Sequence, residues 1–190
     1  MKETSLMIGK QQIIDCLSGI DRNLEDEQSI CIIGSTASIL LGQPNRNTED
    51  IDVWSPASRI QARILKHAVE KAGLLFNPHE DDPERPYVQI VHPGIVQVPK
   101  FDPESDTWID GKKSQVVWQG ERLTVTVPPM EAIVASKLLR FEDQDAQDCI
   151  WILSSKATDA SAIMKAIRGL PRDRREVAED NLELLQYMKP

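Results

Sequence analysis

Ser29-Ile30-Cys31-Ile32-Ile33-Gly34-Ser35 is a short apolar stretch that ends in a glycine and a serine. Its β-branched residues predict a buried strand over residues 29–33, and Gly34-Ser35 predicts the turn that ends this strand. Such a turn, when a helix follows it, offers backbone N–H groups and a hydroxyl to phosphate oxygens. Glycine also lets a phosphate approach the backbone closely. Gly34 and Ser35 are therefore candidate phosphate-binding residues.

Asp50-Ile51-Asp52-Val53-Trp54 follows after a gap of 14 residues, 36–49, and predicts the next strand. Side chains alternate along a strand, so Asp50 and Asp52 point to one face while Ile51 and Val53 face the core. Mg²⁺ prefers hard oxygen ligands, commonly one or two carboxylates completed by water and substrate phosphates. The pair predicts a magnesium–nucleotide site; an exposed strand edge is the ordinary structural alternative.

In the rest of the chain, all the predicted strands lie before residue 128, and only helices are predicted after it. Periodicity and turn residues predict helices over residues 8–20, 36–41, 56–72 (capped by Ser55), 130–140, 144–153, 160–169 and 172–187. Two hairpins are predicted, from residues 87–91 with 95–98 and from residues 116–118 with 123–127. This segregation predicts an α+β fold with a C-terminal helical bundle. We expect a core of residues 1–127 and a helical region of residues 128–190, packed as one compact unit.

Composition narrows the class of protein. The 190 residues are 41% hydrophobic and 27% charged, which is typical of a globular domain. No long apolar stretch predicts a signal peptide or a membrane span, so we expect a cytoplasmic protein without a membrane partner. Cysteine and histidine residues show no metal-ligand spacing. The net charge of −8 opposes a general attraction to nucleic acid.

One segment departs from this acidic balance. Residues 165–175 gather five cations, namely Lys165, Arg168, Arg172, Arg174 and Arg175. They could contact the phosphates of an RNA, or they could form an ordinary solvated helix end and turn, which is the more common role of such a charge run.

The two stretches together resemble the signature of the DNA polymerase beta-like nucleotidyltransferase superfamily. That signature is a hydrophobic residue with Gly-Gly or Gly-Ser, a variable gap, and Asp-x-Asp between apolar residues. Ile33-Gly34-Ser35 and Asp50-Ile51-Asp52-Val53 match it. Within the gap, Arg46-Asn47-Thr48-Glu49 resembles the Arg-x-Thr run of the minimal and abortive-infection-toxin-like branches. The resemblance implies a nucleotidyltransferase-like mixed sheet, Mg²⁺ on Asp50 and Asp52, and a nucleotide contacted by Arg46 and Thr48.

The resemblance extends to about residue 153. Ala135-Ser136-Lys137-Leu138 is similar to a helix of those branches, where the lysine faces the nucleotide phosphates. Asp145 and Asp148 match later aspartates, which implies a role as a base or in holding the acceptor. Taken alone, Lys137 would be a solvent-facing lysine, and the two aspartates would stabilise the start of a helix through its dipole.

The function implied by the resemblance is transfer of a nucleoside monophosphate from a magnesium-bound triphosphate to a hydroxyl. The acceptor would be a tRNA end, a protein side chain or a small molecule. The acidic charge of the chain fits a cationic small acceptor more easily than RNA. Toxin-like members imply a toxin–antitoxin pair and a cognate antitoxin as partner.

One position departs from the family pattern. Active members usually add a third carboxylate on a later strand, and in the predicted strand 95–98 this place falls to Gln97, which carries no charge. Asp102 is close but needs a different strand register. The departure favours an alternative hypothesis, a catalytically lapsed module of the same fold that binds a nucleotide or a partner protein.

Overall fold

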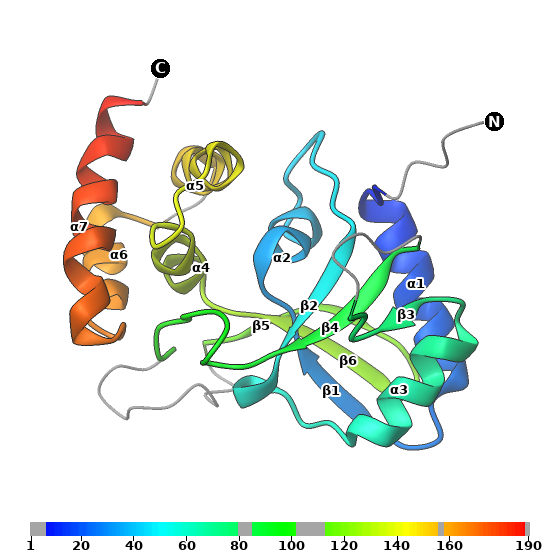
Figure 1. Ribbon diagram of the computed structural model, residues 1–190. Helices are drawn as coiled ribbons and strands as arrows, with labels where there is room; N and C mark the ends of the chain where they lie inside the picture. Colours follow the sequence, from blue (N-terminus) through cyan, green and yellow to red (C-terminus); the bar gives the residue numbers. More distant parts are fainter. Residues whose placement is uncertain (1–6, 80–84, 102–112, 156–157, 189–190) are drawn as a thin grey trace. The chain divides into compact units, whose positions relative to one another are not determined.

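A computed structural model describes residues 7–79, 85–101, 113–155 and 158–188 (Figure 1). The chain folds into two compact units. The N-terminal unit comprises residues 1–91 and 116–127, and the C-terminal unit comprises residues 92–115 and 128–190. Strands and helices together form the α+β fold that the sequence predicts.

The N-terminal unit contains two small sheets of three strands. In one, the central strand β6 (Leu123–Val127) lies between β1 (Gln28–Cys31) and β5 (Gln115–Gln119). In the other, β4 (Tyr87–Val91) lies between β2 (Asp50–Trp54) and β3 (Leu75–Phe76). β1 runs parallel to β6, and β4 runs parallel to both β2 and β3. An antiparallel bridge between Ile32 and Val53 brings the end of β1 to β2.

The strands hold these positions because one face of each is apolar. Ile30, Ile51 and Val53 are buried, as the alternation along their strands predicts. Trp54 is also completely buried, which makes it a core residue. The face of β2 opposite Ile51 and Val53 therefore carries Asp50 and Asp52, which are both partly exposed.

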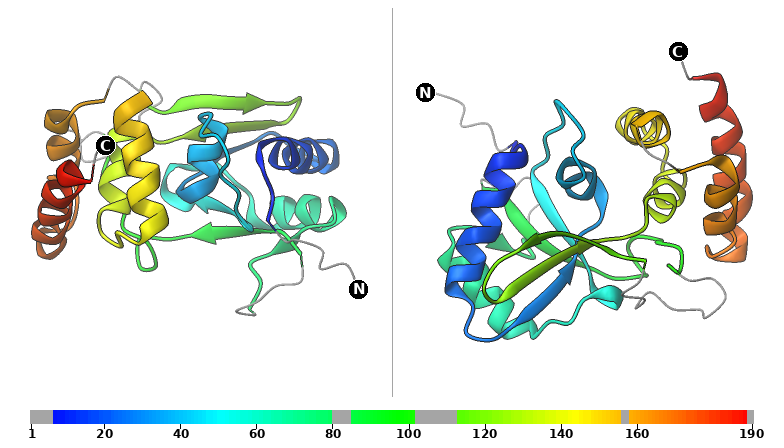
Figure 2. Two further views of the ribbon diagram at one scale, coloured as in Figure 1. Left: turned by 90° about the horizontal axis from the view of Figure 1, so that it is seen from above. Right: turned by 180° about the vertical axis from the view of Figure 1, so that it is seen from behind.

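The described part of the N-terminal unit also contains four helical segments: α1 (Lys10–Asn23), α2 (Gly34–Leu40), the 3₁₀ turn η1 (Ser55–Ala57) and α3 (Ala62–Lys71). α1 packs against α3, and both views of Figure 2 show the two helices side by side. α2 packs on β2. The predicted cap at Ser55 is wrong, because α3 begins at Ala62. Residues 58–61 are extended instead, since Arg59 pairs with Ser29 in an antiparallel bridge.

The two predicted hairpins have different outcomes. β5 and β6 are neighbours joined by residues 120–122, so the second hairpin is confirmed. The first is wrong, because β4 pairs in parallel on both sides and residues 95–98 form no strand. Since Pro93 lies between the two segments, the chain turns away there instead of returning along β4.

Asp21 ties α1 to the β5–β6 hairpin. Its buried carboxylate accepts backbone hydrogen bonds from Glu121, Arg122 and Leu123 at 3.1, 2.8 and 2.7 Å. Burial alone would raise the pKa of Asp21, but these three donors and the Arg122 charge hold it below its usual value. A Cβ atom on Gly120 would lie 2.4 Å from the Asp21 carboxyl carbon, so glycine is the residue that fits this turn.

The C-terminal unit is built mainly from four helices, α4 (Met130–Lys137), α5 (Asp143–Ser155), α6 (Ala160–Ile167) and α7 (Arg172–Tyr187). α4 packs against α5 and α6, and α7 packs against α5 and α6. The start of α6 is capped by Asp159, which accepts a hydrogen bond from the Ala162 amide at 2.8 Å. The predicted helical bundle is therefore present. Among the described residues, no helix is long and apolar enough to span a membrane.

Candidate functional site

The turn after β1 lies directly against the second aspartate of β2. Gly34 has a φ of +67°, a conformation that strains other L-residues, and a Cβ atom there would lie 2.9 Å from Asp52 Oδ2. The preceding Ile33 amide donates to the Asp52 carbonyl at 3.0 Å, which fixes the turn on the strand. Glycine at position 34 therefore keeps the space beside the Asp52 carboxylate open.

The first aspartate is held by threonines. Thr48 Oγ1 donates to Asp50 Oδ1 at 2.7 Å, and Thr36 Oγ1 donates to the Asp50 carbonyl at 2.6 Å. Thr48 is itself buried and joined to Ile8 by two backbone hydrogen bonds of 2.7 and 3.1 Å. The Asp50 carboxylate is thus positioned by a neutral donor, which leaves its negative charge uncompensated by that contact.

The positively charged side chain of Arg46 lies at this turn. The Arg46 guanidinium donates to Ser35 Oγ and to the carbonyl of Asn47, the latter at 2.7 Å. Six residues predicted for the nucleotide site consequently form one continuous cluster in the N-terminal unit: Gly34, Ser35, Arg46, Thr48, Asp50 and Asp52. Positive and negative groups in this arrangement suit a polyanion that arrives with a divalent cation.

Two residues of β4 belong to the same face and were not predicted from the sequence. In the parallel pair of β2 and β4, Tyr87 is the Cα partner of Asp50, and Gln89 is the Cα partner of Asp52. Partners in register carry their side chains on one face of a sheet. Burial, and then the charges of Asp50, Asp52 and Glu49, raise the pKa of Tyr87 to about 12. Its phenol therefore lies in the field of the aspartates.

Gln97 does not occupy the position predicted for it. It lies in the segment after β4 that forms no strand, and its side-chain amide donates to the Pro93 carbonyl at 2.6 Å. Its own carbonyl accepts from Ser136 Oγ at 2.8 Å. The strand residue beside Asp52 is Gln89, so the prediction that placed Gln97 on a strand is wrong. Asp102 lies outside the described residues.

Lys137, Asp145 and Asp148 meet inside the C-terminal unit. Their side chains are 6, 1 and 0% exposed. Lys137 Nζ lies 3.1 Å from Asp145 Oδ1 and 2.7 Å from Asp148 Oδ2. Arg140 adds hydrogen bonds of 2.7 and 3.0 Å to Asp145. The lysine is therefore a buried member of an ion-pair cluster between α4 and α5, unlike an ordinary solvent-facing lysine.

The charges of this cluster determine how Asp145 titrates. Burial alone would raise the pKa of Asp145, but the hydrogen bonds from Arg140 and the charge of Lys137 hold it below its usual value. A carboxylate with a lowered pKa is a weak base at neutral pH. The arrangement is thus better suited to positioning Lys137 than to removing a proton through Asp145.

The residues of the N-terminal cluster fit a magnesium–nucleotide complex. Mg²⁺ in nucleotide sites commonly takes one or two carboxylates and completes its shell with water and phosphate oxygens. Asp50 and Asp52 supply two carboxylates on one face, and Gly34 lies so close to Asp52 that a methyl group there would clash with Oδ2. In the part of the chain that the structure describes, no three His, Cys, Asp or Glu residues form a metal-binding group. Oxygens of the substrate would therefore be needed to complete the ligand shell of the Mg²⁺ ion.

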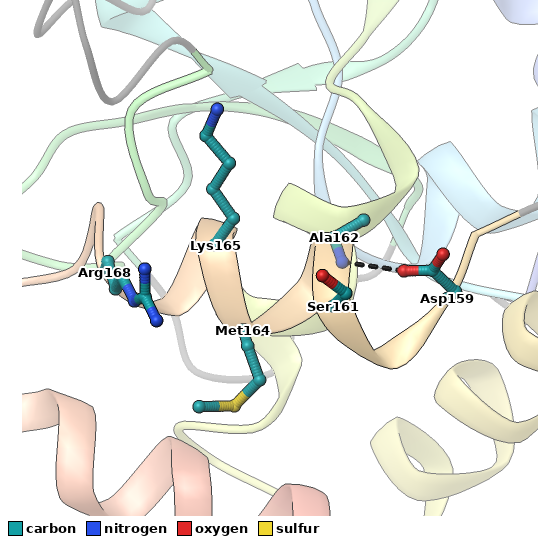
Figure 3. Close-up of a pocket in the computed structure, with 6 residues that line it drawn as sticks. All are labelled: Asp159, Ser161, Ala162, Met164, Lys165 and Arg168. Carbon is teal, nitrogen blue, oxygen red and sulfur yellow. Dashed lines mark hydrogen bonds between the residues drawn. The ribbon is translucent and has the colours of Figure 1, made fainter.

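A separate pocket lies along α6. It is lined by Asp159, Ser161, Ala162, Met164, Lys165 and Arg168, and Figure 3 shows Lys165 and Arg168 extending from the helix. Arg168, Arg172 and Arg174 are exposed, whereas Arg175 Nε donates to the Leu170 carbonyl at 2.9 Å. The basic segment is therefore a surface of the turn between α6 and α7.

Comparison with known proteins identifies one family. Residues 11–160 match the model of a family described as nucleotidyltransferase of unknown function (DUF6036). The match covers 150 of the 190 residues and includes both the Gly34-Ser35 turn and the aspartates of β2. Neither a curated protein nor a solved structure matches the chain.

Proposed function

The chain belongs to this family of nucleotidyltransferases of unknown function, and from that premise we propose that it transfers a nucleoside monophosphate from a magnesium-bound triphosphate to a hydroxyl. The observation that carries the proposal is the approach of Gly34 to the Asp52 carboxylate. It brings the two signature stretches to one place, so close that a Cβ atom on Gly34 would lie 2.9 Å from Asp52 Oδ2.

We assign roles to the residues of the N-terminal cluster from their contacts. Asp50 and Asp52 would hold Mg²⁺, which when bound neutralises charge on the triphosphate oxygens. Gly34 and Ser35 would bind phosphate, and Arg46, fixed on Ser35, would add a positive charge there. Thr48 orients Asp50 through its hydroxyl.

In the transfer itself, the acceptor oxygen forms a bond to the α-phosphorus while the bond from that phosphorus to the bridging oxygen breaks. Pyrophosphate leaves, and the hydroxyl proton passes to solvent or to a base. The protein contributes mainly by holding the reactants in line and by compensating charge. No described side chain of the N-terminal cluster is required to become a covalent intermediate.

Lys137 is a second candidate for a phosphate contact. An ammonium has three N–H donors, and two are directed to Asp145 and Asp148. We propose that the two aspartates hold Lys137 in place; its contact with a nucleotide phosphate is proposed by family resemblance alone. A role of Asp145 or Asp148 as a base or in holding the acceptor is likewise proposed by family resemblance alone.

We propose three chemical classes of acceptor for the nucleoside monophosphate. A tRNA end is supported by the exposed arginines of the α6–α7 turn, and a cationic small molecule is supported by the net charge of −8. A protein side chain is the third class, and a toxin role with a cognate antitoxin is proposed by family resemblance alone. The cytoplasmic location and the division into residues 1–127 and 128–190 stay predictions.

The test is transfer of label from α-phosphate-labelled triphosphates to a cell lysate in the presence of Mg²⁺. We expect one class of component to be labelled, and we expect Asp50→Ala and Asp52→Ala to abolish labelling. Asp26→Ala, which removes an exposed carboxylate elsewhere in the same unit, is the matched control. Labelling that persists in both site variants would contradict the proposal.

The alternative function is nucleotide binding without transfer. Gln89, the neutral residue beside Asp52, favours it because the described site offers two carboxylates. Magnesium-dependent nucleotide binding without labelling of any acceptor would select this alternative. Absence of binding would exclude both functions.

A further inference from the structure

The strand next to the two aspartates carries neutral side chains. β2 and β4 are parallel and in register over five residue pairs, from Asp50 and Tyr87 to Trp54 and Val91. Asp50 therefore faces a phenol, and Asp52 faces the amide of Gln89. Val88, between these two residues, is buried on the opposite face. The number of carboxylates on the site's face is therefore set by β4 as much as by β2.

Two divalent cations in one site need more negative charge than the described residues of this face supply. Paired cations in phosphoryl-transfer sites lie about 3.5–4 Å apart and repel one another. Their ligands are chiefly carboxylates and substrate phosphates. Among the described residues of this face, Asp50 and Asp52 are the carboxylates, and Asp50 Oδ1 already accepts a hydrogen bond from the Thr48 hydroxyl. The protein ligands thus favour one cation.

We propose that Gln89 takes the place of a third acidic ligand and limits this site to a single divalent cation that arrives with the nucleotide. The inference rests on the proposed function and deepens it. An amide oxygen can accept a hydrogen bond from a cation-bound water, but it adds no charge with which to hold a second cation.

The single cation has a chemical consequence. Asp50 and Asp52 would hold the one cation that, together with Arg46, compensates charge on the triphosphate, whereas the attacking hydroxyl has no second cation to lower its pKa. Deprotonation then depends on a base or on solvent, so transfer is slower than in a site with three carboxylates. Nucleotide binding is unaffected by this limit.

The test counts cations in complexes with non-transferable nucleotides. Mn²⁺ replaces Mg²⁺ because it shares the preference for oxygen ligands and is paramagnetic. The full-length protein is kept in excess over each of the four common α,β-methylene nucleoside triphosphates in turn, so that all nucleotide is bound. Electron paramagnetic resonance then reports bound Mn²⁺ per nucleotide and any magnetic coupling between two ions.

We expect one Mn²⁺ per bound nucleotide in the wild-type protein, without coupling. In Gln89→Asp we expect two coupled ions, with the second bound at least tenfold more tightly than in the wild type. Gln89→Asn preserves the amide and should still bind one ion. Gln115→Asp adds the same charge at an exposed position of β5 and should also bind one.

The possible results distinguish failure of the single-cation inference from failure of the proposed function. Two ions per nucleotide in the wild-type protein overturn the inference and leave the proposed function standing. One ion in a folded Gln89→Asp protein also overturns the inference, and Gln89→Glu serves as the second variant if Gln89→Asp unfolds. Wild-type protein that binds no nucleotide with Mn²⁺ overturns the proposed function, and the inference with it.

Discussion

Gly34 and Asp52 face one another across the turn and the strand, with space for a hydrogen but not for a methyl group between them. A Cβ atom on Gly34 would approach Asp52 Oδ2 to 2.9 Å. Gly34 also holds a φ of +67°. The residue is thus required twice, once for the backbone conformation and once for access to the carboxylate.

Gly34→Ala should separate these two requirements. We expect a stability loss of about 1–2 kcal/mol from the left-handed backbone conformation, together with at least tenfold weaker nucleotide binding. Gly73→Ala is the matched control, because Gly73 has a φ of +85° and no heavy atom within 4 Å of its Cβ position. It should lose similar stability and bind nucleotide normally. Urea unfolding and calorimetry measure the two effects, and equal loss of binding in both variants would refute the argument.

Asp21 should make the stability of the protein depend on pH. Its folded pKa is below its usual value, so its contribution is complete above the unfolded pKa and is lost as pH falls through the folded pKa. At neutral pH we expect Asp21→Ala to cost about 1–3 kcal/mol, because buried N–H donors lose their acceptor. The difference in unfolding free energy from the wild type should shrink in acid. A difference that stays constant down to pH about 2 contradicts this account.

Lys137 should be important for stability as well as for any phosphate contact. Lys137→Met leaves two buried carboxylates without their shared cation, and we expect a loss of about 3–5 kcal/mol. Asp148→Asn added to Lys137→Met should recover part of the loss. Arg140→Met should cost less, because the Arg140 side chain is 64% exposed. Urea unfolding near neutral pH is the measurement, and a Lys137→Met protein as stable as the wild type would disprove the role of the cluster.

Tyr87 reports the field of the two aspartates. Its pKa of about 12 should fall toward the ordinary value in Asp50→Asn, because burial and the nearby negative charges both keep the phenol protonated. The chain has two tyrosines, so Tyr187→Phe leaves Tyr87 as the only phenol. Ultraviolet absorbance of tyrosinate, recorded as pH rises, gives the pKa in both backgrounds. An unchanged pKa in Asp50→Asn would contradict a contribution from the Asp50 charge.

The local features of the site could be predicted from the sequence. The glycine turn and the Asp-x-Asp strand each depend on a few adjacent residues, and alternation alone places Asp50 and Asp52 on one face. The limits of α7 in the C-terminal unit also agree with those predicted. The roles of Asp50, Asp52 and the glycine turn in binding or catalysis stay predictions.

The non-local features could not be predicted. Nothing in the sequence around Tyr87 indicates that its strand pairs in parallel with β2, so the sequence does not identify Gln89 and points to Gln97 instead. β3 is only two residues long, which is too short to give a pattern. Asp21 finds its partners about a hundred residues away, and such pairing depends on the whole fold.

The most direct test of the magnesium–nucleotide site is calorimetric titration of each nucleoside triphosphate, with and without Mg²⁺, into the wild-type protein and into Asp52→Asn. Asp26→Asn is the charge-matched control, and circular dichroism checks that each protein is folded. We predict magnesium-dependent binding to the wild type and to Asp26→Asn, weakened at least tenfold in Asp52→Asn. Binding that is independent of Mg²⁺, or equal in a folded Asp52→Asn protein, would contradict the site.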